Sequence, residues 1–219
     1  MDAGREADRK LGSWAGREAL LQSALDAVQA LNERTLMGLV RLAEERLPNP
    51  PRLVGAVAAE LRDLDPSACP TIARQPFLFV DFAFGNPRTL LPVLSRDPKP
   101  FRFPPPRGTF PVGEATALAR GALVLAQAVC RHHPAHVGLL LGLHPMLQQP
   151  MAALRLPDID HIAEESAHLL TPRWDNRPDI WRALLATGES LDPAAIERFT
   201  MYGIQLIAGD LARRVRHGG

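Results

Sequence analysis

The chain has 219 residues, of which 46% are hydrophobic and 22% charged, with a formal net charge of +1 at pH 7. This composition is that of a globular protein and excludes a disordered chain. The near-neutral charge excludes a global attraction to nucleic acid or anionic membrane, so any DNA contact would be local or shared with a partner.

Apolar residues recur at helical spacing through most of the first half of the chain. This spacing predicts helices over residues 17–31, 34–46 and 52–64. Asn32 is expected to cap the second of them, because its side chain can accept from backbone N–H groups at a helix start. The proline-rich run at residues 48–51 is expected to end that helix.

Two caps and one aromatic segment follow. Asp65 before a proline predicts a short helical element reaching about residue 74, and Asn86 before a proline predicts another, reaching about residue 95. Residues 76–84 lie between them and are rich in aromatic and β-branched side chains. That composition favours an extended segment.

Residues 98–112 contain six prolines, which a packed helix or central strand cannot accommodate. One interpretation is a semi-rigid linker between two units, residues 1–97 and 113–219. The other is a docking strip for a partner, because aromatic and basic residues alternate there. The residues predicted to bind that partner are Phe101, Arg102, Phe103 and Arg107.

Prolines start most of the predicted helices in the second unit. The expected helices cover residues 113–131, 134–143, 145–154, 157–167, 178–186 and 192–214, with an extended segment at 168–174. Gly203 and Gly209 on the last helix are expected to allow close approach of another element.

The two units show an internal similarity. A shift of 90 positions places residues 72–94 on residues 162–184 without a gap, including Ile72-Ala73 on Ile162-Ala163. A duplication would predict two copies packed about a pseudo-twofold axis, as the subunits of a homodimer are. The alternative is chance similarity between two helical units with similar caps.

Several short apolar motifs of the second unit occur in the order and spacing of a known family. They are Leu125-Ala126-Gln127, Leu141-Gly142-Leu143, Ala152-Ala153-Leu154, Leu156-Pro157, Ala163-Glu164, Arg173-Trp174-Asp175 and Gly203-Ile204. By these motifs the stretch from Leu123 to about Leu211 resembles FlhD, a subunit of the bacterial flagellar master regulator.

The resemblance implies an all-helical fold that dimerises extensively. It also implies a role in transcription activation, with DNA contacted mainly alongside FlhC, a zinc-bearing partner. The family has one unit per chain, whereas two are predicted here. The cysteine often found in the family's extended segment is not matched in the run Leu169-Leu170-Thr171-Pro172, so a covalent dimer through that position is not expected.

We therefore expect an all-α protein of two FlhD-like units packed as an intrachain pseudo-dimer. Its expected function is transcriptional regulation through an FlhC-like partner, with DNA bound only within that complex. The alternative is a non-DNA-binding adaptor or antagonist that imitates an FlhD dimer. A cytoplasmic location without membrane attachment is expected, because the N-terminus lacks an apolar signal segment, and homo-oligomerisation is left open.

Local DNA contact would fall to the densest basic group of the chain. Its members are Arg198, Arg213, Arg214 and Arg216. Arginines there could bind phosphates and make DNA binding salt-dependent. Alternatively, they are present because cations stabilise the C-terminus of a helix. No helix-turn-helix pattern with a basic recognition helix is present, so independent reading of a DNA sequence is not expected.

Catalytic and metal-binding patterns are weak. Cys130 and four histidines lie close in sequence, at residues 132, 133, 136 and 144, but without a standard zinc spacing. Glu165 and His168 form only one of the two pairs that a di-iron bundle needs. Nucleophile-elbow and phosphate-loop motifs are missing from the sequence. We therefore expect no enzyme activity, no metal and no cofactor, and a buried, inert thiol at Cys69.

Overall fold

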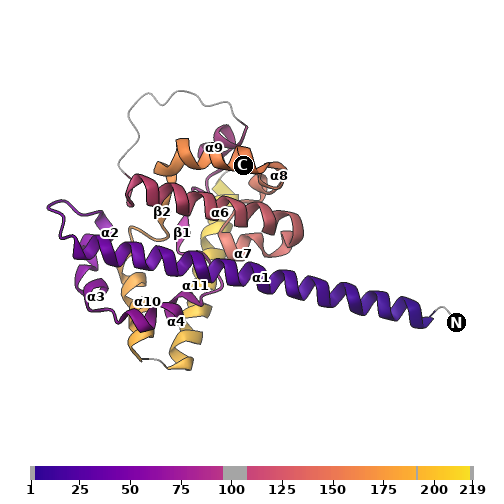
Figure 1. Ribbon diagram of the computed structural model, residues 1–219, viewed down its shortest axis with the longest axis horizontal. Coiled ribbons are helices and arrows are strands. Elements are labelled where there is room, and N and C mark those ends of the chain that lie inside the picture. The colour runs from indigo at the N-terminus through magenta and orange to yellow at the C-terminus, as the bar shows by residue number, and fades with distance from the viewer. Residues whose placement is uncertain (1–2, 96–107, 191, 218–219) are drawn as a thin grey trace.

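The computed structural model describes residues 3–95, 108–190 and 192–217. This part of the chain is mostly helical, with a single two-stranded sheet, which confirms the predicted all-α class. Figure 1 shows the helices gathered around two long ones near the middle of the fold.

The first half contains one long helix, then short helices and a strand. In chain order these are α1 (Ala3–Glu44), α2 (Arg52–Ala56), α3 (Ala58–Asp63), η1 (Pro66–Ala68), α4 (Cys69–Ala73), β1 (Val80–Asp81) and α5 (Pro87–Leu94). The second half repeats this order with additions.

The second half also starts with a long helix. Its elements are α6 (Val112–His132), η2 (Pro134–His136), α7 (Val137–Leu141), η3 (Pro145–Leu147), α8 (Gln148–Ala153), α9 (Leu156–Ser166), η4 (Ala167–Leu169), β2 (Thr171–Pro172), α10 (Pro178–Ser190) and α11 (Pro193–His217). Helix α11 has no counterpart among the described residues of the first half.

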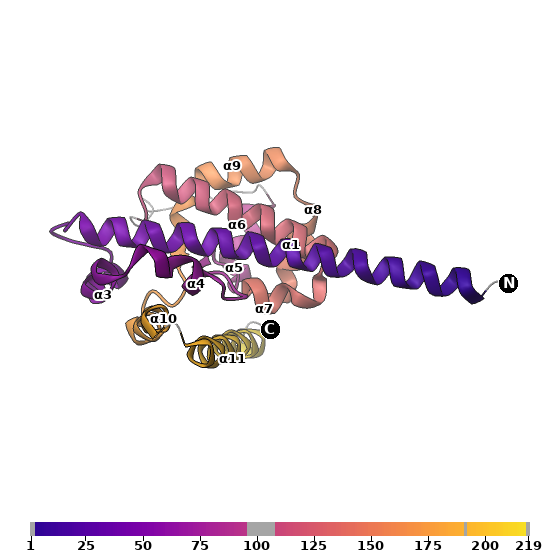
Figure 2. The same cartoon turned by 60° about the horizontal axis from the view of Figure 1, so that its bottom comes forward.

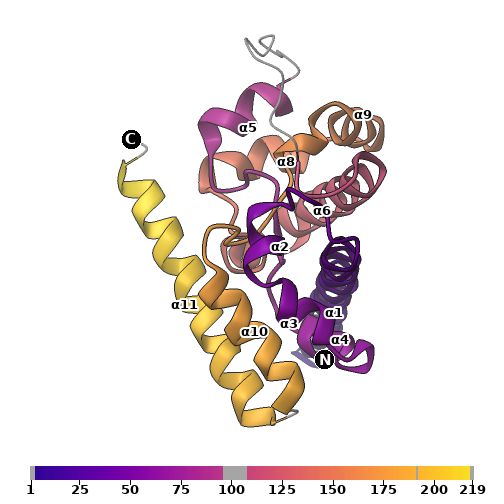
Figure 3. The same cartoon turned by 90° about the vertical axis from the view of Figure 1, so that its left-hand side faces the viewer.

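Helices α1 and α6 pack against each other and form the centre of the fold (Figures 1 and 2). Helix α1 also contacts α3 and α4, while α6 contacts α8 and α9. The last short helix of each half crosses to the other: α10 contacts α3 and α4, and α5 contacts α8 and α9. Helix α11 lies along α10 and reaches α7 (Figure 3).

The two halves share one hydrophobic core, since buried apolar side chains of both belong to one continuous cluster. Strands β1 and β2 cross the middle of it as an antiparallel pair, with Val80 opposite Pro172 and Asp81 opposite Thr171. Two rings of the extended segment before β1 pack edge-on against the second half: Phe77 on Trp174 and Phe79 on Trp181.

The predicted caps are confirmed. The Asp65 side chain accepts from the N–H of Ser67 at 2.9 Å, and the Asn86 side chain accepts from that of Thr89 at 3.3 Å. Proline occupies one of the first two positions of both elements, where its missing N–H leaves no helical hydrogen bond unmade.

The prediction of two helices over residues 17–46 is wrong, because α1 is continuous from Ala3 to Glu44. Asn32, predicted to cap a second helix, lies inside it and is fully buried. Its amide group donates to the carbonyls of Ala73 at 3.2 Å and Phe77 at 2.9 Å and accepts from the Phe79 N–H at 2.7 Å. The amide thus satisfies the irregular backbone before β1 instead of ending a helix.

Three other expectations need correction. The helix predicted over residues 52–64 is interrupted at Val57, where the backbone leaves the helical region. Each predicted extended segment contains a strand of only two residues, and η4 occupies the start of the second one. Gly203 lies against the ring of Phe77 as expected, whereas Gly209 has no neighbour within 4 Å.

Helix α6 has the length and apolar composition of a membrane span by those criteria alone. Half of its most apolar window, 50%, is buried inside the fold. Contacts with α1, α8 and α9 account for this burial. Its apolarity therefore follows from its position at the centre of the core.

Candidate functional site

The arginines predicted to contact DNA are distributed along α11 and are engaged with protein groups. Arg198 lies 3.5 Å from the carboxylate of Asp192, and Arg213 lies 2.5 Å from that of Asp210. Arg198 and Arg213 are fifteen residues apart, about 22 Å along a helix at 1.5 Å per residue. Arg216 donates to the Ala212 carbonyl at 3.1 Å.

Arg214 has a packing role that sequence reasoning missed. Its guanidinium lies so close to Gly85 that a side chain at that position would overlap it. Arg214 also lines a small polar cavity of about 50 Å³ together with Asp81, Arg173 and Asp210. Helix α11 is thereby connected to the turn after β1, and Arg214 is partly withdrawn from solvent contact.

Arg173 is the central group of that polar cavity and is 8% exposed. It donates to the carbonyls of Leu78 at 2.7 Å and Leu141 at 2.6 Å. Burial lowers the pKa of the Arg173 guanidinium, and the neighbouring carboxylate of Asp81 opposes that shift. The side chain joins the second half of the chain to backbone beside β1, which is a structural role.

The residues predicted to form a docking strip, Phe101, Arg102, Phe103 and Arg107, lie outside the described residues. The described end of the same proline-rich segment is packed. Phe110 is 5% exposed, and its ring lies close to the buried Gly38 of α1.

The largest open feature beside the core is a pair of adjoining hollows along the seam between α1 and α6, which we call the α1–α6 groove. The first has a volume of about 430 Å³ and the second about 730 Å³. Both are lined by Ala30 and Arg34. The α1 residues that line the groove extend from Leu20 to Arg41.

The walls of the α1–α6 groove are mainly small and apolar. The small residues are Ser23, Ala24, Ala27 and Ala30 on α1, and Ala117, Gly121 and Ala128 on α6. Gly121 is required there, because a Cβ at this position would lie 2.6 Å from the side chain of Leu31. Cations line the groove, with Arg34 and Arg41 on α1 and Arg120 on α6. This shape and polarity suit a helix with an apolar stripe.

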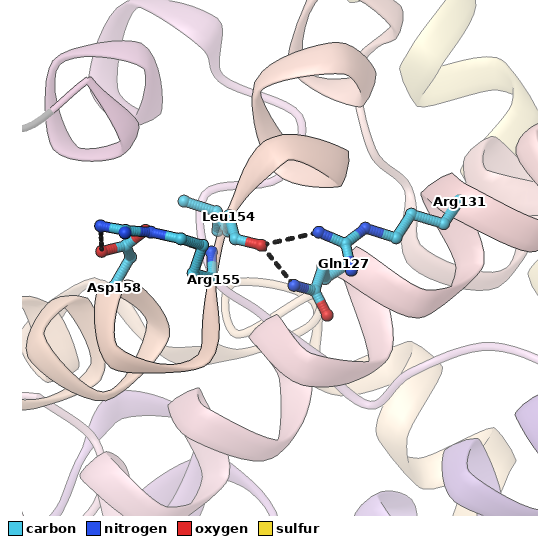
Figure 4. Close-up of polar contacts among 5 residues, drawn as sticks. All are labelled: Gln127, Arg131, Leu154, Arg155 and Asp158. Carbon is cyan, nitrogen blue, oxygen red and sulfur yellow. Dashed lines mark hydrogen bonds and ion pairs between the residues drawn. The ribbon is translucent and has the colours of Figure 1, made fainter.

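The polar contacts at the far end of α6 are explained by folding alone. Gln127 and Arg131 both donate to the Leu154 carbonyl at the end of α8, the Arg131 bond being 2.9 Å (Figure 4). Arg155 and Asp158 then form a capping box at the start of α9. These contacts fix the junction of three helices, and they involve several of the motifs shared with the FlhD pattern.

The groups considered for metal binding are arranged for other purposes. Glu165 pairs with His161 at 3.3 Å, and burial lowers the pKa of His168. Burial raises the pKa of the Cys130 thiol to about 11 and raises that of Cys69 as well. Within the described residues, no three His, Cys, Asp or Glu side chains gather closely enough to hold a metal ion.

A comparison of the chain with protein-family models found no match, nor did searches of curated proteins and of solved structures.

Proposed function

We propose that the chain is a single-chain pseudo-dimer of two FlhD-like units. Its function would be to regulate transcription by contact with a protein partner of the FlhC type, and DNA would be bound only within that complex. The observation that carries the proposal is a correspondence between the packing contacts of the two halves. That arrangement is expected when two copies of one unit pack about a pseudo-twofold axis.

The correspondence extends to the helices that cross between the halves. If the halves are exchanged, α1 becomes α6, α3 and α4 become α8 and α9, and α5 becomes α10. The contacts of α1 with α3 and α4 then become those of α6 with α8 and α9. The contacts of α10 with α3 and α4 likewise become those of α5 with α8 and α9.

The strands follow the same rule. Exchanging the halves converts the pair Val80–Pro172 into the pair Asp81–Thr171, so the sheet maps onto itself. The starts of β1 and β2 are 91 positions apart (80 to 171), as are the starts of α5 and α10 (87 to 178). This separation is one residue more than the 90 of the sequence alignment, so one inserted residue before the strands would account for the difference.

The charges of α11 support action through a partner. Arg198 and Arg213 are paired with carboxylates, and Arg214 packs on Gly85. Phosphate binding by these three groups would need those contacts to be exchanged, which reduces the gain in affinity. DNA binding by the isolated chain should therefore be weak and strongly salt-dependent.

The test is co-expression of the full chain with the FlhC protein of the same organism, followed by size-exclusion chromatography with light scattering. Co-elution at a fixed ratio is expected, and the complex should bind promoter DNA more tightly than either protein alone. Separate elution at micromolar concentrations would overturn the proposal.

The alternative, an adaptor or antagonist that imitates an FlhD dimer, is favoured by the carboxylate pairing of the same arginines. It gives a different result in the same assay. The complex would form, but addition of the chain would reduce the DNA binding of a separate FlhD–FlhC complex. Arg216→Glu is the informative variant, because it should weaken DNA binding by the complex only if the first proposal holds.

A further inference from the structure

We propose that two copies of this chain associate through α1. The N-terminal part of α1 from each copy, residues 3–19, would lie antiparallel in the α1–α6 groove of the other copy, with both Leu20 residues on the twofold axis. This inference is independent of the FlhC-type partner, because it rests only on α1 and α6.

The first observation is an uncovered helix. Helix α1 begins at Ala3, but the first buried side chain recorded along it is that of Ala24. Figures 1 and 2 show this end of α1 projecting well beyond every other element. About 20 residues at 1.5 Å each make roughly 30 Å of helix. A helix of this length is marginally stable in water without a packing partner.

The exposed part of α1 also continues an apolar stripe. Val28 and Ala24 are buried at the edge of the fold, and the next positions outward are half-buried Leu21 and Leu20, which is 49% exposed. An apolar stripe that runs from a core onto an uncovered helix indicates a surface buried in an assembly.

The second observation is the fit between this projection and the groove beside it. The α1 residues that line the groove extend from Leu20 to Arg41, about 30 Å of helix, which matches the length of the projection. On α6, Ala117 and Ala128 are exposed at the groove and Gly121 is half-buried. Small residues at these positions allow another helix to approach closely.

An antiparallel pair centred on Leu20 places each residue opposite the one whose number completes a sum of 40. Gly16 then lies opposite Ala24, and Ser13 opposite Ala27. Leu20, Ala24 and Ala27 line the groove, and helical spacing places positions 13 and 16 on the same face of α1. The residues brought together near the axis are therefore small, with one leucine from each copy at the centre.

The same register supplies complementary charge. Position 6, a glutamate, lies opposite Arg34, which lines both hollows of the groove. Because the contact is isologous, the pair Glu6–Arg34 occurs twice in each dimer. Each copy both donates a helix and accepts one, so the assembly closes at two chains.

Cross-linking tests the axis. In Leu20→Cys the two introduced thiols should meet, and mild oxidation should give a disulfide-linked dimer. Leu47→Cys is the matched control, since Leu47 is also exposed, at 39%, but lies beyond α1. Both native cysteines are buried and should not contribute. Equal cross-linking of the two variants, or none for Leu20→Cys, would overturn the proposal.

Charge exchange tests the register. Arg34→Glu and Glu6→Arg should each raise the dimer dissociation constant by roughly tenfold in sedimentation velocity, because each places two like-charge pairs in the dimer. The double variant should restore the dissociation constant to within about twofold. Circular dichroism identifies any variant that has lost its fold.

The alternative occupants give distinct outcomes. A chain that sediments as one copy at every concentration would show that the groove is left for another protein, and the proposal would fail. A dimer that is insensitive to both charge changes would show that the copies meet elsewhere, and the proposal would fail again. A complex with FlhC that forms while these α1 variants are monomeric would leave the proposed function intact.

Discussion

Replacing Arg173 with methionine should destabilise the protein more than any other single arginine replacement among the described residues. The guanidinium is 8% exposed and donates to the Leu78 carbonyl at 2.7 Å and the Leu141 carbonyl at 2.6 Å. Methionine fills a similar length but donates no hydrogen bond. Both carbonyls would then remain buried without these donors.

The magnitude follows from two opposing contributions. Two hydrogen bonds from a charged donor contribute about 1.5–3 kcal/mol each, or roughly 3–6 kcal/mol together. Removing a charged group from a low-dielectric site recovers part of its desolvation cost, which is about several kcal/mol. We therefore expect a net loss of about 2–4 kcal/mol in the free energy of unfolding.

Urea denaturation followed by tryptophan fluorescence measures this loss, because Trp181 is buried and donates to the Arg173 carbonyl at 2.8 Å. With a denaturant slope of about 3 kcal/mol per molar, the midpoint should fall by roughly 1 M. Arg177→Met is the matched control, since Arg177 is an exposed side chain paired with Asp179, and its midpoint should stay unchanged. Equal midpoints for the two variants would refute the argument that Arg173 connects the two halves.

Three further outcomes are expected. Gly203→Ala should lower the free energy of unfolding by about 1–3 kcal/mol because the new methyl group overlaps Phe77, while Gly209→Ala, in open space, should raise it by up to about 1 kcal/mol; denaturation midpoints in the reverse order would contradict this. With its pKa raised to about 11, the Cys130 thiol should not react with a disulfide reagent at pH 8 until the chain is unfolded, and rapid native labelling would count against its burial. Because burial lowers the pKa of His168, the unfolded chain binds the proton first, so stability should fall as pH drops below about 6.5; an unchanged pH slope in His168→Gln would exclude this histidine as the cause.

The elements set by local chemistry could be predicted from the sequence. Asp65 and Asn86 cap helices through N–H groups two and three residues away, so the signal and its effect lie within one turn. The all-α class follows from apolar periodicity in the same local way. The short helices after these caps were therefore placed to within a few residues.

Features that depend on distant partners were missed. Asn32 has the composition signal of a cap, but its amide bonds to backbone atoms 41 to 47 positions away. A residue that can end a helix can equally satisfy a distant irregular segment, and only the tertiary structure decides between the two. The continuity of α1 was lost for this reason.

The candidate site was predicted only in part. The basic character of α11 is visible in the sequence, but the contacts of Arg214 with Gly85 and of Arg213 with Asp210 are not. The α1–α6 groove was also missed, because it needs two helices from opposite halves of the chain. The alternation of small residues at Ala117, Gly121 and Ala128 was a usable signal, since their spacing of four and seven places them on one helical face.

The exchange of α5 and α10 between the halves has a consequence for synthesis on the ribosome. Helices α3 and α4 pack against α10, which is translated about 100 residues later, a delay of roughly 5–20 s at bacterial elongation rates. During that interval the nascent first half presents an apolar surface without its covering helix. A chaperone that binds nascent chains would encounter this surface first, so depleting such a factor should reduce the yield of soluble chain.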